Sequence, residues 1–153
     1  MIKIIKYFFQ SFLIYFLFFI GRFLGLKISR KLFAYLFYLF GPLFKSKKVI
    51  KKNLKIFSQR INNLDEKKIM SSVWKNYGMT FIEYIFLDYF KKKNTIVTIK
   101  DNGNLSQIIN DKKPVIFISG HFANFELMSM EITKKKIPLA TIYRPLNNFF
   151  LNP

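Results

Sequence analysis

An uncharged apolar run near the N-terminus, Tyr7 to Gly21 (YFFQSFLIYFLFFIG), constrains how the rest of the chain can be arranged. Lys3 and Lys6 precede this run, and Arg22 follows it. As a helix it would measure about 22 Å, whereas the hydrocarbon core of a bilayer is about 30 Å thick. The flanking cations can reach the headgroups and make up the difference. The run predicts an uncleaved anchor that spans the membrane or lies embedded in it. A buried core helix is the alternative.

A second apolar run, Leu32 to Phe44 (LFAYLFYLFGPLF), is too short to span a membrane. Ser29 is a candidate cap for its helix, and Gly41-Pro42 is expected to end it. We expect an interfacial or re-entrant helix packed against the first run. The basic segment Lys45 to Phe57 then has helical periodicity. It fits either a helix on lipid headgroups or a solvated helix with its apolar stripe toward the core. We therefore expect residues 1–44 to form a membrane anchor with an interfacial helix, and residues 45–153 a second domain.

The charge of the chain is large and uneven. Lys and Arg number 26 against 8 Asp and Glu, for a formal charge of +18, and no acidic residue precedes Asp65. An apolar, purely cationic N-terminal part suits an anionic membrane surface. Nucleic acid fits poorly, because the basic residues flank Phe- and Leu-rich runs instead of lining a polar groove. With no Cys and one His, the sequence predicts no disulfide and no metal site.

The rest of the sequence predicts one long helix, followed by shorter segments whose composition is typical of strands. Residues 65–90 carry an apolar stripe behind Asp65 and Glu66, and Gly78 within it suggests close packing. Beyond them, short apolar or β-branched runs predict strands at residues 95–100, 115–119 and 137–143. A helix from about Asn124 to Lys135 separates the last two. This order predicts an α/β fold, with part of a mixed or parallel sheet and flanking helices behind the membrane helices.

The candidate chemical site is Ser119 to Glu126 (SGHFANFE), where a predicted strand ends and a helix begins. Open α/β sheets bind ligands at the carboxyl ends of their strands. His121 is the only histidine, and Glu126, in the first helical turn, could reach back to its imidazole. A carboxylate on one ring nitrogen leaves the other free to remove a proton. We interpret His121 as a general base acting on an acceptor hydroxyl. A capping or core histidine is the alternative, since the spacing alone is common.

Three blocks of the sequence resemble one family. Gly120 to Glu126 (GHFANFE) resembles the G-H-F-G-N-W-E block of the late acyltransferases of lipid A biosynthesis, the lauroyl and myristoyl transferases. Tyr143 to Asn148 (YRPLNN) resembles their Y-R-P-x-x-N block. Lys51 to Leu54 with Phe57 resembles their basic-x-N-L-x-x-x-F segment. The blocks stand in the family's order behind a hydrophobic segment, so the resemblance covers essentially the whole chain.

The resemblance implies a glycerolipid-acyltransferase-like fold and an enzyme of the bacterial inner membrane with its catalytic part on the cytoplasmic face. It would move a fatty acyl group from acyl carrier protein to a hydroxyl of a lipid A precursor, with no cofactor beyond this donor. By the same likeness, His121 is the base and Glu126 its partner. Arg144 would hold an anionic group such as a phosphate, and Asn124 and Asn147 are candidate substrate-binding residues. The implied partners are acyl carrier protein, a phosphorylated glycolipid and anionic membrane lipid, but no nucleic acid.

The chain also departs from the family's pattern. Ala123 stands in place of the usual Gly, Phe125 in place of Trp, and Phe149 in place of Pro. The resemblance implies a longer protein, so we expect an N-terminal part of the acyltransferase domain that is inactive or unstable alone. Two alternatives stay open: an acyltransferase for another glycolipid, and a non-enzymatic basic membrane-anchored interaction protein.

Overall fold

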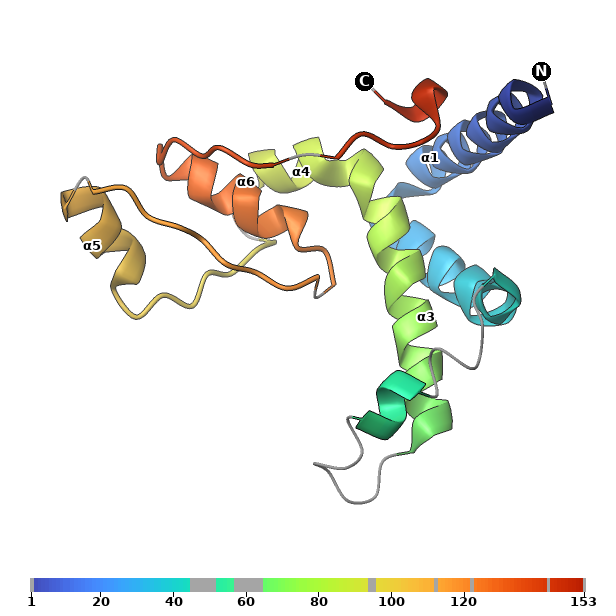
Figure 1. Ribbon diagram of the computed structural model, residues 1–153, viewed down its shortest axis with the longest axis horizontal. Coiled ribbons are helices and arrows are strands. Elements are labelled where there is room, and N and C mark those ends of the chain that lie inside the picture. Colours follow the sequence, from blue (N-terminus) through green and yellow to red (C-terminus); the bar gives the residue numbers. More distant parts are fainter. Residues whose placement is uncertain are drawn as a thin grey trace. The chain divides into compact units, whose positions relative to one another are not determined.

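The computed structural model describes residues 2–44, 52–56, 65–93, 96–111, 113–121, 123–142 and 144–152. Its regular elements are helices (Figure 1), namely α1 (Ile2–Phe44), α3 (Glu66–Glu83), η1 (Tyr84–Phe86), α4 (Leu87–Lys92), α5 (Asn104–Asp111), α6 (Glu126–Lys134) and η2 (Phe149–Leu151). Residues 52–56 form a further short helix. The chain divides into two compact units, Phe12–Ile85 and a second made of Met1–Ser11 with Phe86–Pro153. The expected domain boundary after residue 44 stays a prediction.

The expected α/β sheet is wrong: the described residues contain no strand. Residues 113–121 and 137–142 are extended, but they do not pair with each other. Both segments instead line a cavity of about 1160 Å³, together with residues of α5 and α6. Their β-branched and apolar residues favour an extended backbone, yet a strand also needs a hydrogen-bonded neighbour. Residues 96–100, where a strand was also expected, are irregular; Thr95 lies outside the described residues.

Both apolar runs belong to one helix, α1, which is broken at a single residue. Gly25 has φ 73° and ψ 164°, a conformation that glycine adopts readily. The Ser29 hydroxyl, which is fully buried, donates a hydrogen bond of 2.6 Å to the carbonyl of Gly21 across this bend. Ser29 therefore bridges the two arms of α1 and does not open a separate helix. The helix also continues past Pro42 to Phe44 instead of ending at Gly41-Pro42.

Within the unit of residues 12–85, small residues let α1 and α3 approach closely. A Cβ added at Gly21 would meet the Ile82 side chain, and one added at Gly41 would overlap the Trp74 ring. A Cβ at Gly78 would overlap the backbone carbonyl of Phe33. Interfaces made of small residues are typical of helices packed in membranes. The close packing expected at Gly78 is confirmed. In the described part of this unit, the buried large apolar side chains gather along this contact: Phe33, Trp74 and Ile82.

Two arginines of α1 contact the last residue of α3 and the η1 turn that follows it. Arg30 Nε lies 2.9 Å from the Oε1 atom of Glu83, whose side chain is only 9% exposed. The Arg22 guanidinium donates to the carbonyl of Ile85 at 3.2 Å. Cations are stabilised at the negative end of a helix, where the last carbonyls lack intrahelical partners. At the other end, the Asp65 carboxylate caps α3 by accepting a 3.0 Å bond from the Lys68 amide.

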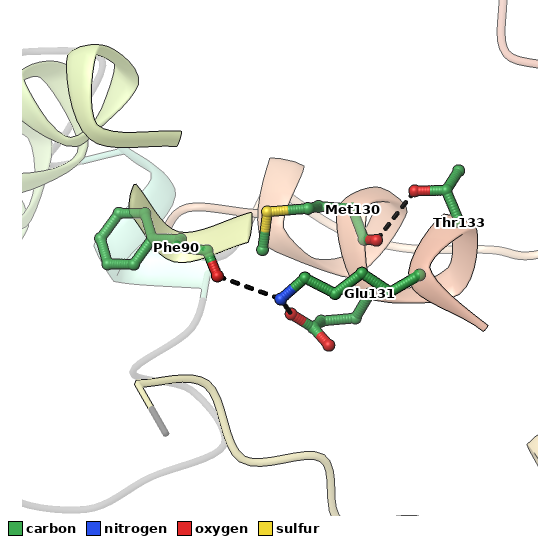
Figure 2. A network of polar contacts seen from close by, with 5 residues as sticks. Phe90, Met130, Glu131 and Thr133 are labelled. Carbon is green, nitrogen blue, oxygen red and sulfur yellow. Dashed lines mark hydrogen bonds and ion pairs between the residues drawn. The ribbon is translucent and has the colours of Figure 1, made fainter. Parts of the chain in front are cut away.

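In the other unit, α4 and α6 are joined by one lysine (Figure 2). Lys134 Nζ donates to the Phe90 carbonyl at 3.0 Å and lies 2.6 Å from a Glu131 carboxylate oxygen. Phe90 and Ile132, one from each helix, are buried. The lysine thus satisfies a carbonyl in the last turn of α4 and ties α6, which begins at Glu126, to it.

The glycine contacts predict unequal costs for two matched substitutions. Gly78→Ala should destabilise the protein by about 1–3 kcal/mol, because the new methyl group overlaps a backbone carbonyl that cannot rotate away. Gly21→Ala should change stability by no more than about 1 kcal/mol, because alanine favours the helix and the Ile82 side chain can move. Denaturant unfolding in mild detergent would measure both. Equal effects at the two positions would contradict the packing described.

Candidate functional site

His121 lies at the end of the extended segment 113–121 and is exposed. Its ring stacks at a tilt on Phe125, with ring centroids 4.4 Å apart and an interplanar angle of 58°. Phe125 directly precedes α6, so this aromatic contact holds the imidazole near the start of the helix. Phe122, the residue between the histidine and the turn, lies outside the described residues.

Glu126, the expected partner of His121, is the first residue of α6 and is half-buried. Among the described residues, no hydrogen bond or ion pair joins its carboxylate to the imidazole of His121. A carboxylate in the first turn of a helix is also stabilised by the helix dipole. The pairing of His121 with Glu126 stays a prediction.

The turn between these two residues depends on a strained backbone. Ala123 has a φ of 47°, in the left-handed region that L-residues other than Asn and Asp rarely adopt. This is the position where the family's block has Gly, which reaches such angles without a steric cost. Asn124, which follows, is buried, and its carbonyl accepts a 3.3 Å bond from the Leu127 amide at the start of α6. These contacts are those of a residue that shapes the turn, and the expected substrate-binding role of Asn124 stays a prediction.

Arg144 and Asn147, the other two candidate binding residues, are both exposed. Neither makes a hydrogen bond or an ion pair with another residue in the described part of the chain. Tyr143, which begins their block, lies outside it. An exposed guanidinium presents its donors to solvent and to ligands, so the binding roles of Arg144 and Asn147 stay predictions.

Asn148, which sequence reasoning passed over, is the anchored residue of this block. It is buried, and its Nδ2 atom donates to the Tyr7 carbonyl at 2.9 Å. Its Oδ1 atom accepts from the Phe150 amide at 3.1 Å and lies 3.1 Å from the Ser11 hydroxyl. The side chain therefore both caps η2 and ties it to the first turns of α1. A pair of adjacent asparagines carries no signal that distinguishes the buried one from the exposed one.

Aromatic contacts strengthen this attachment. The rings of Phe149 and Tyr7 lie 6.5 Å apart, and those of Phe150 and Phe8 lie 5.8 Å apart, both edge-to-face. Phe149, which replaces the family's usual Pro, thus contributes to packing here. The loop that carries Arg144 and Asn147 is fixed to α1 by these side chains.

Two further observations concern ligands and the membrane. The described residues contain no cluster of three His, Cys, Asp or Glu that could hold a metal ion. By length and composition, Ile2–Leu43 is long and apolar enough to cross a membrane.

Comparison with protein families identifies the chain more closely. Residues 1–153 match the model of the bacterial lipid A biosynthesis acyltransferases, and the chain belongs to this family. The resemblance carried by the three sequence blocks is confirmed. Neither curated proteins nor solved structures gave a match.

The strained turn predicts that Ala123→Gly stabilises the protein, by about 1 kcal/mol at most, because glycine relieves the positive φ. Ala140→Gly is the matched control. It lies in an extended segment without positive φ, so the added glycine entropy should destabilise by about 0.5–1 kcal/mol. Thermal unfolding of both variants would compare the signs. A loss of stability in Ala123→Gly would contradict the strain.

Alanine substitutions of the two neighbouring asparagines should affect the stability of the protein differently. Asn148→Ala should destabilise the protein by about 1–3 kcal/mol, because it leaves buried hydrogen-bonding groups unsatisfied. Asn147→Ala, at an exposed position, should leave stability within about 0.5 kcal/mol of the starting protein. Unfolding curves would measure both changes. Equal stability of the two variants would show that the attachment of η2 to α1 is weak.

Proposed function

We propose that this protein transfers a fatty acyl group from the thioester of acyl carrier protein to a hydroxyl of a lipid A precursor. The observation that carries this proposal is membership of the lipid A biosynthesis acyltransferases over residues 1–153. The exposed His121, with its ring supported by Phe125, is the best candidate base among the described residues, because the chain has no other histidine. The proposed site of action is the cytoplasmic face of the bacterial inner membrane.

In the proposed reaction, one nitrogen of the His121 imidazole takes the proton of the acceptor hydroxyl. The acceptor oxygen attacks the thioester carbonyl, and a new C–O bond forms. The tetrahedral intermediate then collapses as the C–S bond breaks. The thiolate of the carrier leaves with the proton from the imidazolium, so the products are one ester and one thiol. Glu126 would stabilise the imidazolium once its carboxylate reaches the ring in the complex with substrate. Hydrogen bonds between catalytic groups are often long in the free enzyme and tighten only when substrate binds.

The other family residues have proposed roles in binding. Arg144 would hold a phosphate of the acceptor or donor through its forked donors. Asn147 lies in the same exposed loop and would contact the sugar or phosphate. Asn124 would act through the turn that precedes α6, because its side chain is buried.

The charge of the chain supports the proposed partners. Acyl carrier protein is acidic, the acceptor is a phosphorylated glycolipid, and the membrane surface carries anionic lipid. All three suit a formal charge of +18. The apolar helix α1 would keep the enzyme where its lipid acceptor resides.

The central test replaces the proposed base in the full-length enzyme. His121→Ala should lower turnover with acyl carrier protein donor by at least about a hundredfold, the range typical of general base catalysis. Glu126→Gln should also lower turnover strongly, because a neutral amide stabilises an imidazolium less. Acyl transfer to a phosphorylated glucosamine disaccharide acceptor would be measured by mass spectrometry.

Gln107→Ala, an exposed substitution on α5, is the control and should retain normal turnover. Comparable unfolding curves for all variants would exclude misfolding as the cause of any loss. Near-normal turnover of a folded His121→Ala protein would contradict the proposed mechanism. Transfer to a different glycolipid in preference to the lipid A precursor would contradict the proposed acceptor.

A further inference from the structure

The side chain of His121 is exposed and has no polar partner in the described part of the chain. No hydrogen bond or ion pair there involves its imidazole. Exposed side chains that lack such a bond change rotamer within nanoseconds. A general base has to lie within hydrogen-bond reach of the proton that it removes, so free rotation of its ring lowers the rate. The group that orients the His121 ring in the free enzyme must therefore act without a polar bond.

Phe125 makes the ring contact that restricts the imidazole. The two ring centroids lie 4.4 Å apart at an interplanar angle of 58°. Tilted rings at about this separation are an arrangement that aromatic pairs prefer, because the positive edge of one ring meets the negative face of the other. The preference concerns angle as well as distance. The contact therefore restricts the orientation of the imidazole as well as its position.

Phe125 itself is held in place by α6. Its backbone has helical angles, φ −64° and ψ −18°, and its carbonyl accepts a 3.0 Å hydrogen bond from the Met128 amide. Its side chain is half-buried. At the other end of α6, Lys134 bonds to the Phe90 carbonyl of α4. The Phe125 ring is thus attached to a helix that is fixed at both ends, whereas His121 lies outside any helix.

A strained turn lies between the two rings. His121 and Phe125 are four residues apart, but the chain between them is not helical, and Ala123 has the positive φ of 47° described above. Strained backbone persists only where surrounding contacts determine it, and it is common at active sites. The ring contact and the bonds at the start of α6 are contacts of this kind.

We propose that Phe125 is a positioning residue, which orients the His121 imidazole for proton transfer before substrate binds. It acts through the ring of the base, and Glu126 takes effect later, when the imidazolium forms. Because the preferred angle is a property of aromatic pairs, Trp can replace Phe125 in this role and Leu cannot. This inference rests on the proposed function, in which His121 is the base.

Steady-state kinetics of the full-length enzyme test the role of Phe125. Phe125→Leu should lower kcat roughly tenfold, the value of one aromatic pair expressed as a rate. KM should stay within about twofold, because the lost contact is with the base and not with the substrate. Phe125→Trp should retain most of the turnover, since it keeps an aromatic ring beside His121.

Phe37→Leu is the matched control. Phe37 is another half-buried phenylalanine, and its ring lies 5.4 Å from that of Phe81 in the unit of residues 12–85. The same chemical change there should leave kcat as it was. Unfolding curves of all variants would be measured alongside, so that only folded enzymes are compared.

NMR of enzyme labelled with ¹³C-histidine observes the ring contact directly. The signals that disappear in His121→Ala belong to this residue. The ring current of Phe125 should displace them from the positions of a free histidine. Phe125→Leu should abolish this displacement, whereas Phe37→Leu should preserve it. Glu126→Gln should preserve it as well, because no bond joins that carboxylate to the imidazole among the described residues.

Several results would overturn the inference. One is an undisplaced His121 signal in the starting enzyme, which requires no variant to fold. Others are an unchanged kcat in folded Phe125→Leu, an equal loss of kcat in Phe37→Leu, or an equal loss in Phe125→Trp. Loss of the displacement in Glu126→Gln would assign the orientation of the ring to the carboxylate. All of these results leave the proposed function intact, whereas near-normal turnover of His121→Ala would overturn the assignment of the base itself.

Discussion

The close contact between α1 and α3 is the constraint on which the arrangement of residues 12–85 depends. It requires glycine at positions where a methyl group would overlap a ring or a carbonyl, as at Gly41 and Gly78. It also requires the bend at Gly25, which the buried Ser29 hydroxyl bridges. Arg30 and Glu83 add an ion pair at the end of α3. The helix α3 thus covers one face of α1 and leaves other apolar side chains of α1, such as Tyr35 and Leu43, exposed.

In the other unit, the two sequence blocks that resemble the family's motifs, at residues 120–126 and 143–148, differ in how they are held. The histidine block depends on a left-handed Ala123 and on the start of α6, so its geometry is local. The arginine block is attached by Asn148 to Tyr7 and Ser11, far away in the chain. An exposed Arg144 beside a buried Asn148 fits a loop in which one residue anchors and its neighbours bind ligand. Ligand binding by Arg144 and Asn147 in that loop is part of the proposed function.

Much of the helical structure could be predicted from the sequence, because apolar periodicity and caps such as Asp65 act locally. The bend at Gly25 could not be predicted, because a glycine within an apolar run is compatible with a straight helix as well as with a broken one. The sheet was predicted wrongly for a related reason: the residues at 115–119 and 137–143 favour extended backbone, but pairing depends on neighbours that the local sequence does not specify. Family motifs located His121, whereas Asn148 needed three-dimensional contacts to be found.

The central claim is that this family member passes an acyl group directly from a carrier thioester to a lipid hydroxyl. The most direct measurement counts both products when the full-length enzyme acts on acyl carrier protein donor and a phosphorylated disaccharide lipid in vesicles. Direct transfer predicts one free thiol for each acyl ester formed on the acceptor. Thiol release that is matched by free fatty acid, with no ester on the lipid, would contradict it.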